Sequence, residues 1–216
     1  MVEKFIKDST RLIVSEACIA RGLNWLRQAE PKFNDAAKLT GPIPLRLLDD
    51  GFSRLLSAIV SQQLSVASAD AIWCRLKEAD KITIKGIENA QDDDLRACGL
   101  SRQKIRYARA LCAANVDYAA LRTASTEEVV KALVKISGIG AWTAEIYAMF
   151  SLGRADVFAP GDLALQEAVK ILFDLEKRPT EKQLRIMAEK WSPWRAVAAR
   201  LLWAYYQQVK SREGIR

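Results

Sequence analysis

The sequence contains no histidine. That absence excludes Ser-His-Asp and Cys-His catalysis and the usual zinc sites, so any chemistry must come from carboxylates, lysine, tyrosine or the backbone. Cysteine is scarce as well, and no two cysteines form a C-x-x-C pair; the four are Cys18, Cys74, Cys98 and Cys112. We interpret them as buried thiols of a protein from a reducing, cytoplasmic setting, and their spacing predicts no iron–sulfur cluster.

Long apolar runs and strand patterns are also missing. No run approaches the roughly 20 residues needed to cross a bilayer, and no apolar signal region stands at the N-terminus, so we expect no membrane part. Helical spacing recurs instead, without a heptad array or a solenoid repeat. The sequence therefore predicts an all-α chain of about ten helices of ordinary length, packed into two lobes.

What the sequence has in excess is positive charge. Lysine and arginine number 33 against 26 acidic residues, a net charge of +7. This balance favours an anionic partner such as nucleic acid. The chain of 216 residues, half of them hydrophobic, can bury roughly 70% of its unfolded surface and has no segment with the composition of disorder.

Local signals predict where several helices begin and end. Apolar spacing predicts a helix from Ser9 to Ala29, and Asp49 or Asp50 is positioned to cap a helix that begins near Gly51. Further starts are indicated by the acidic run 92–94, by a helix over 101–114, and by Thr180-x-x-Gln183 and Ser192-Pro193.

Two apolar helical segments meet across Gly138-Ile-Gly140. The first opens with Ser125-Thr-Glu-Glu128, the pattern of a capping box, and the second runs over Ala141–Phe150. The glycines leave the first amides of the second helix uncovered, which suits an anion such as a phosphate. A helical hairpin that only needs glycine to turn is the alternative.

The segment ISGIGAWTAEIYA, residues 136–148, resembles the helix-hairpin-helix of the HhH-GPD DNA glycosylases. The resemblance continues into residues 156–162, DVFAPGD, which are similar to the family's Gly/Pro-rich loop ending in the catalytic aspartate, and it covers about residues 45–206. It implies a single HhH-GPD unit over 1–216, with a central lobe of about 45–160 and a second lobe of about 1–44 plus 161–216. Ser137 and Gly161 depart from the residues common in the family, and the length leaves no room for an N-terminal β-domain.

The segment FSRLLSAIVSQQLSVASA, residues 52–69, is similar to the part of AlkA-type enzymes that inserts a wedge into the DNA minor groove. The resemblance implies DNA contacts from Gln62, Gln63 and Leu64, with Gln63 or Leu64 filling the space of a flipped nucleotide. A plain polar junction between two helices is the alternative.

The resemblance also implies the remaining site residues. It makes Asp162 the catalytic carboxylate, although Asp162 also fits an ordinary N-cap, and it makes Gly138, Gly140 and Thr143 DNA contacts. Trp142 and Trp203 are the expected aromatic walls of the base pocket, Trp203 following a motif, Trp191-Ser-Pro-Trp-Arg195, that the family shares. No cofactor is required, and the hairpin is able to hold Na⁺ or K⁺ on the carbonyls of Ile136 and Ile139.

The function implied is that of a monofunctional glycosylase that flips alkylated bases of the 3-methyladenine or 7-methylguanine type out of duplex DNA and hydrolyses their N-glycosidic bonds. A bifunctional lyase needs a lysine where this chain has Trp142. A non-catalytic DNA-binding hairpin protein and a glycosylase for another lesion class, such as ethenoadenine or hypoxanthine, remain alternatives. We expect a monomer that binds double-stranded DNA and resides in the cytoplasm, associated with the nucleoid if bacterial.

Overall fold

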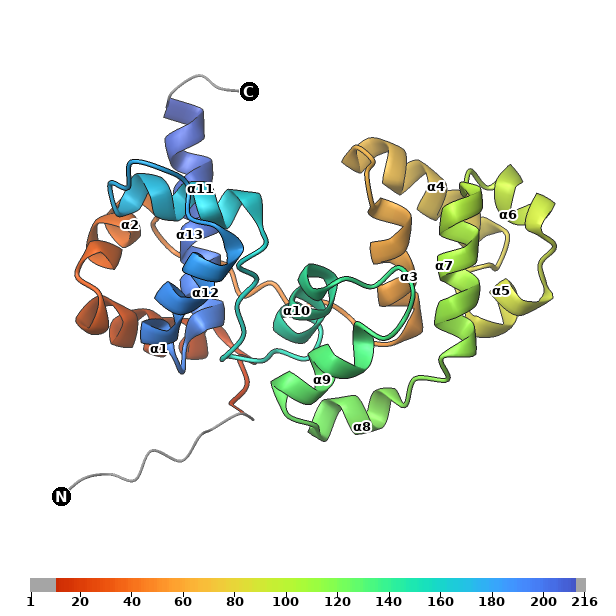
Figure 1. The fold of residues 1–216 in the computed structure, drawn as a ribbon, viewed down its shortest axis with the longest axis horizontal. Helices are drawn as coiled ribbons and strands as arrows, with labels where there is room; N and C mark the ends of the chain where they lie inside the picture. The colour runs from red at the N-terminus through yellow and green to blue at the C-terminus, as the bar shows by residue number, and fades with distance from the viewer. Residues whose placement is uncertain (1–10, 213–216) are drawn as a thin grey trace. The chain divides into compact units, whose positions relative to one another are not determined.

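The structure is a computed structural model that describes residues 11–212 (Figure 1). Within these residues the secondary structure is thirteen α-helices and one short 3-10 helix, and the only β pairing is an isolated bridge between Leu12 and Arg154. The elements are α1 (Glu16–Ala29), α2 (Lys32–Thr40), α3 (Phe52–Ser61), α4 (Val66–Glu78), α5 (Ile84–Asn89), α6 (Asp92–Ala97), α7 (Arg102–Ala113), α8 (Tyr118–Thr123), α9 (Thr126–Leu133), α10 (Ala141–Phe150), α11 (Leu163–Leu172), α12 (Glu181–Ala188), η1 (Glu189–Trp191) and α13 (Arg195–Arg212). The prediction of an all-α fold is confirmed, and the helices that local signals did not indicate include the six-residue α5 and α8.

The chain divides into two compact units. Among the described residues, unit 1 consists of the chain up to Leu48 together with the chain from Ala148 onward, and unit 2 of Asp49–Tyr147. The second boundary therefore lies within α10, before the position near residue 160 that the sequence suggested. The segment after α10 belongs to unit 1 because it pairs with the start of the described chain: Ala155 donates its amide proton to the Arg11 carbonyl, at 2.9 Å.

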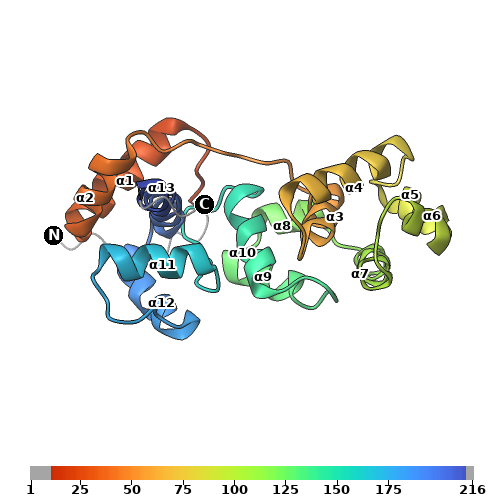
Figure 2. The ribbon, with the colours of Figure 1, turned by 90° about the horizontal axis from the view of Figure 1, so that it is seen from above.

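Unit 1 is built around α13, with α1, α2 and α11 packed against it (Figure 2). Residues 196–202 of α13 are all buried, so this segment of the helix contacts neighbours on every side. An aromatic cluster of Phe33, Phe158, Phe173 and Trp191 lies beside it, with ring centroids 5.3–6.2 Å apart. Such rings bury large apolar areas and supply much of the stability of a small core.

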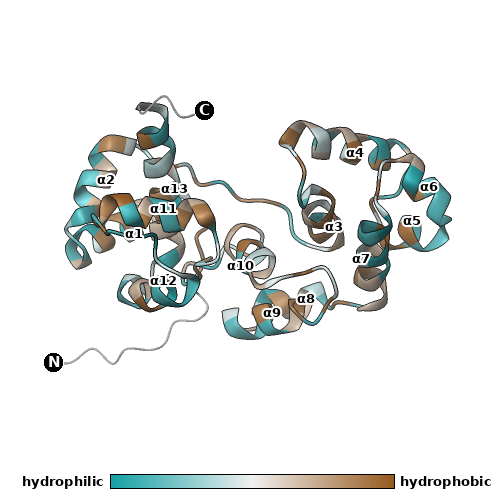
Figure 3. Ribbon diagram, turned by 45° about the horizontal axis from the view of Figure 1, so that its top comes forward, coloured by the Kyte–Doolittle hydropathy of each residue, from teal (hydrophilic) through white to brown (hydrophobic). Residues whose placement is uncertain are grey.

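In unit 2, α3 packs against α4 and α7, and α5 and α6 also pack against α7. Leu55, Leu56 and Ile59 of α3 are fully buried at this junction. Most helices in Figure 3 carry teal and brown residues together, as expected for helices that bury one face and expose the other.

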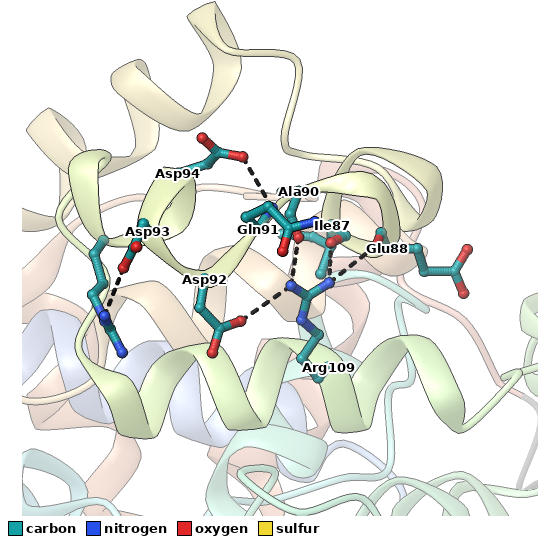
Figure 4. Close-up of polar contacts among 9 residues, drawn as sticks. Ile87, Glu88, Ala90, Gln91, Asp92, Asp93, Asp94 and Arg109 are labelled. Atoms are coloured by element: carbon teal, nitrogen blue, oxygen red, sulfur yellow. Dashed lines mark hydrogen bonds and ion pairs between the residues drawn. The ribbon is translucent and has the colours of Figure 1, made fainter.

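The guanidinium of Arg109 holds the short helices of unit 2 in place (Figure 4). It donates to the carbonyls of Ile87, Glu88 and Ala90 around the end of α5 and pairs with Asp92 at the start of α6. Carbonyls at a helix end have no amide partner inside the helix, so a cation there satisfies them and favours the helix dipole.

The predicted helix from Ser9 begins too early. Its first residues lie outside the described residues, and α1 starts only at Glu16. Residues 11–14 are extended because the amide of Ile13 donates to the Gly153 carbonyl at 2.7 Å, next to the bridge between Leu12 and Arg154.

Three further local expectations are wrong. The N-cap of α3 is Gly51 rather than Asp49 or Asp50, and Asp50 instead receives two hydrogen bonds from the Arg122 guanidinium, at 2.7 and 3.1 Å. The helix expected from Pro193 begins at Arg195, after the 3-10 turn of η1. Cys74 is exposed, whereas the other three cysteines are buried as expected.

Of the helices described, none is long and apolar enough to span a bilayer.

Candidate functional site

The hairpin between α9 and α10 begins with the predicted capping box. Ser125 Oγ accepts from the Glu128 amide at 3.2 Å and the Glu128 carboxylate accepts from the Ser125 amide at 2.8 Å, which confirms the expected start of α9. Gly138 has a φ of +95°, and a Cβ there would lie 2.4 Å from Cγ of Tyr107. The backbone conformation and the ring of Tyr107 together therefore require glycine at position 138.

Position 140 differs from position 138, because neither the backbone conformation nor a neighbouring atom requires glycine there. Its φ is not in the left-handed region, and a Cβ built there would meet no atom within 4 Å. It stands directly before α10, where the first amides of a helix have no acceptor inside the helix. The open space beside Gly140 suits the close approach of an anion. Thr143 is only 6% exposed, so little of this residue is accessible for the predicted DNA contact.

The two carbonyls predicted to bind a monovalent cation are those of Ile136 and Ile139, and one of them already accepts a hydrogen bond. The Ile136 carbonyl accepts the amide of Ile139 at 3.0 Å, and both side chains are buried. A carbonyl oxygen has two lone pairs, so Ile136 keeps the capacity to coordinate a Na⁺ or K⁺ ion.

The wedge loop, defined as Gln62, Gln63 and Leu64, connects α3 and α4. Gln62 Nε2 donates to the Gly138 carbonyl at 2.8 Å, so this side chain ties the wedge loop to the hairpin rather than pointing outward. Gln63 has a left-handed φ of +57° and is exposed, and Leu64 is 40% exposed. Gln63 and Leu64 are thus the two members of the wedge loop that face solvent.

A cavity of about 450 Å³ in unit 2 brings the wedge loop and the hairpin helix together. Gln62 and Gln63 line one part of it, and Trp142 and Thr143, from the first turn of α10, line another. Trp142 is 45% exposed, which is unusual for a tryptophan in a packed unit and suits a ring that contacts a ligand.

Asp162 stands at the N-terminus of α11, in unit 1. Its Oδ1 accepts from the Leu165 amide at 3.0 Å, as an N-cap does, and from Nε1 of Trp203 at 3.1 Å. Trp203 in turn stacks on Phe150, with ring centroids 5.8 Å apart. Two of the predicted site residues, Asp162 and Trp203, are therefore in direct contact. The chemistry available is that of a half-buried, oriented carboxylate beside an electron-rich ring.

The loop that leads to Asp162 is anchored by residues that the sequence interpretation did not single out. Asp156 Oδ2 accepts from the Ser192 hydroxyl at 2.8 Å, and Oδ1 accepts from Nε of Arg195 at 2.6 Å. Ser192 and Arg195 are the polar members of the Trp191–Arg195 motif, whose tryptophans are buried. The loop of residues 156–162 and the Trp191–Arg195 motif thus contact each other, and no signal in either segment alone predicts this contact.

Arg200 was also missed. Its guanidinium is buried, 4.6 Å from the ring centroid of Phe150, and donates to the Met149 and Ala196 carbonyls. Burial, and then the neighbouring Arg46, lowers the pKa of Arg200 to about 10. Arg200 therefore fixes Phe150, the ring on which Trp203 stacks.

The predicted site residues fall into two sets, one in each unit. Unit 2 holds the hairpin glycines, the wedge loop and Trp142, whereas unit 1 holds Asp162 and Trp203. In unit 2 Gln62 bonds to Gly138 and lines a cavity with Gln63 and Trp142, and in unit 1 Asp162 contacts Trp203.

One family of known proteins matches more than half of the chain. Residues 56–193 match the family described as HhH-GPD superfamily base excision DNA repair protein. The chain is 32% identical over 161 residues to DNA-3-methyladenine glycosylase 1 of Schizosaccharomyces pombe, over 70% of this chain and 71% of that protein. A crystal structure of a DNA-3-methyladenine glycosidase from Bacillus halodurans is similar with a TM-score of 0.79 and 30% identity, over 89% of this chain and 91% of that one. The structure of a Schizosaccharomyces pombe 3-methyladenine DNA glycosylase in complex with abasic DNA is similar with a TM-score of 0.68 and 31% identity, over 80% and 89% of the two chains.

The family match spans well over half of the 216 residues, and it runs from within α3 through α10, with the wedge loop and the hairpin, and the loop that ends in Asp162. The chain therefore belongs to the HhH-GPD superfamily of base excision DNA repair proteins.

Proposed function

We propose that the chain is a monofunctional DNA glycosylase that removes alkylated bases from duplex DNA and so initiates base excision repair. The contact between Asp162 and Trp203 carries this proposal, because it places a carboxylate and an aromatic ring together at the start of a helix. The names of the relatives, DNA-3-methyladenine glycosylases, and the abasic DNA bound by one of them support the same activity.

The reaction breaks the bond between C1′ of the sugar and the ring nitrogen of the base. A base methylated at a ring nitrogen carries positive charge, so the electron pair of the bond leaves with the base and neutralises it. The sugar is left as an oxocarbenium ion, which the Asp162 carboxylate stabilises in a site where water screens charge poorly. A water molecule then adds to C1′ and releases a proton, leaving an abasic site.

The aromatic residues suit a cationic base. Attraction between a cation and the face of an indole contributes about 0.5–2 kcal/mol, and Trp142 and Trp203 are the candidates for this contact. No histidine is needed for such a leaving group, which agrees with the absence of that residue. No cofactor is needed either, and a Na⁺ or K⁺ ion on the Ile136 and Ile139 carbonyls would serve to present the hairpin to a phosphate. We propose that the enzyme works with DNA in the cytoplasm, at the nucleoid in a bacterium.

Two measurements test the function. Single-turnover release of 3-methyladenine, 7-methylguanine, ethenoadenine and hypoxanthine from duplex DNA should show the methylated bases released first; release of none would leave a protein that only binds DNA. Borohydride added during turnover should trap no covalent protein–DNA adduct, because Trp142 occupies the place of the Schiff-base lysine. A trapped adduct would reassign the enzyme as a lyase.

A further inference from the structure

The end of α3 is held by a cation from α7. Lys104 Nζ donates to the carbonyl of Val60, at 2.6 Å. Val60 is the penultimate residue of α3, and the last carbonyls of a helix lack an amide partner inside the helix. The ammonium therefore satisfies one of these carbonyls and neutralises the negative end of the helix dipole, directly before the wedge loop begins.

Helix α7 also supports the hairpin. Tyr107, one turn after Lys104 on α7, packs its ring against Gly138. Gln103 Nε2 donates to the Tyr107 hydroxyl at 2.6 Å, and Gln62 Nε2 donates to the Gly138 carbonyl at 2.8 Å. One face of α7 thus contacts both the chain before the wedge loop and the hairpin, and Gln62 joins the two.

Lys104 is an unusual residue for this position. It is half-buried, burial lowers its pKa below the ordinary value of a lysine, and the ion pairs of the described residues do not include it. A lysine that is partly desolvated without a carboxylate lowers the stability of the fold. Among the described residues, the Val60 carbonyl is the group to which the Lys104 ammonium donates, so the charge of this half-buried lysine serves that bond.

We infer that Lys104 is a positioning residue for base flipping, which holds the end of α3 so that Gln63 and Leu64 enter the DNA stack in register with the hairpin. This inference rests on the proposed function. Lys104 itself contacts neither the base nor the sugar. Its removal should leave the phosphate contacts of the hairpin intact and slow the step in which a paired base leaves the helix.

Arg109 provides a matched control. It lies on the same helix and also donates to carbonyls at a helix end, those of Ile87 in α5 and of the C-cap residue Ala90, and neither is part of the wedge loop (Figure 4). Arg109→Met should therefore lower the melting temperature without a specific effect on flipping, whereas Lys104→Met should act on flipping.

The experiment compares single-turnover excision of one alkylated base in two duplexes, one with the base paired and one with it unpaired in a single-nucleotide bulge. Lys104→Met should slow excision of the paired base about tenfold, the effect of one charge-assisted hydrogen bond, and excision of the unpaired base less than about twofold. Lys104→Arg should restore most of the rate on the paired base. Affinity for DNA with a stable abasic analogue should stay within about threefold of wild type for every variant.

Two further readouts make the result decisive. In a Gln63→Ala, Leu64→Ala background, Lys104→Met should add no further slowing, because the side chains that it positions are gone. A 2-aminopurine placed beside the lesion reports unstacking without any chemistry, and its fluorescence should rise less with Lys104→Met than with wild type. If wild type released no base from either duplex, the proposed function would fail, and the fluorescence would still test Lys104.

Equal slowing on both duplexes, or a paired-to-unpaired ratio that matches wild type or Arg109→Met, would overturn the inference. If Lys104→Met did not fold, Lys104→Gln would be measured in its place and judged by the same ratio.

Discussion

The indole nitrogen of Trp203 and the main-chain amide of Leu165 both donate to the same oxygen, Oδ1 of Asp162. Two donors from different helices fix the plane of the carboxylate, since one comes from α11 and the other from α13. Such preorganisation is valuable in a reaction in which positive charge develops on a sugar, because little reorganisation is then needed when that charge appears. The N-cap role and the catalytic role of Asp162 are thus compatible.

Replacing Trp203 with Phe tests the indole donor. Phenylalanine keeps an aromatic ring against Phe150 and removes the N–H that reaches Asp162. A hydrogen bond to a charged group contributes about 1.5–3 kcal/mol, so single-turnover excision should slow about 10- to 100-fold. Trp191→Phe is the control: Trp191 packs in the aromatic cluster against Phe33 and Phe173, so this variant should reduce the melting temperature more than the rate. A Trp203→Phe rate close to wild type would remove the indole N–H from the mechanism.

Signals carried by neighbouring residues made much of this structure predictable. The capping boxes at Ser125 and Thr180 and the N-caps at Ser101 and Asp162 depend on residues three positions apart, which a sequence displays directly. The start of the first helix was not predictable in this way, because it depends on a hydrogen bond to a residue far away in the sequence. Residues 11–14 have helical spacing, but the carbonyl of Gly153 offers the amide of Ile13 a different hydrogen bond.

In the candidate site, too, contacts between residues far apart in the sequence were the ones that could not be predicted. The sequence indicated Gln62 as a polar residue facing DNA, and the structure turns its amide to Gly138, 76 residues away. The pairing of Asp156 with Arg195 and the bond from Lys104 to the Val60 carbonyl also join residues far apart in the sequence. No periodicity or spacing encodes such pairs, so they emerged only once the helices were packed.

Gly138 and Gly140 should respond differently to alanine. Gly138→Ala introduces a side chain at a φ of +95° and against the Tyr107 ring, which should cost about 2–5 kcal/mol of the free energy of unfolding. Gly140→Ala meets open space, so its melting temperature should match wild type. If the amides beside Gly140 hold a DNA phosphate, Gly140→Ala should nevertheless weaken binding about 10-fold or more, with or without a lesion.

Denaturant unfolding and titration of DNA with a stable abasic analogue measure the two effects separately. Unchanged affinity of folded Gly140→Ala would count against phosphate binding at the hairpin. A loss of affinity that appears only with damaged DNA would argue instead for a role in lesion recognition.

The wedge loop is tested by replacing Gln63 and Leu64 together with alanine. Both side chains are exposed, and within the described part of the chain neither forms a hydrogen bond like that of Gln62, so the double variant should fold with little loss of stability. Filling the space of the flipped base offsets part of an unstacking cost of a few kcal/mol, so excision of a paired base should slow about 10-fold or more. Stopped-flow measurement of base release gives the rate. A wild-type rate on a stable duplex would place the wedge elsewhere in the chain.

The charge of Asp162 is tested by Asp162→Asn. Asparagine keeps an oxygen able to accept from Leu165 and Trp203, so the cap and the indole contact should survive, and affinity for abasic DNA should stay near wild type. Removing the charge that faces the oxocarbenium ion should cost about 3–4 kcal/mol, a slowing of roughly 10²–10³ in single-turnover release of an alkylated base. Asp156→Asn is the control for a nearby structural carboxylate, whose partners are Ser192 and Arg195, and it should lower stability first. Excision by Asp162→Asn within a fewfold of wild type would show that another group opposes the charge on the sugar.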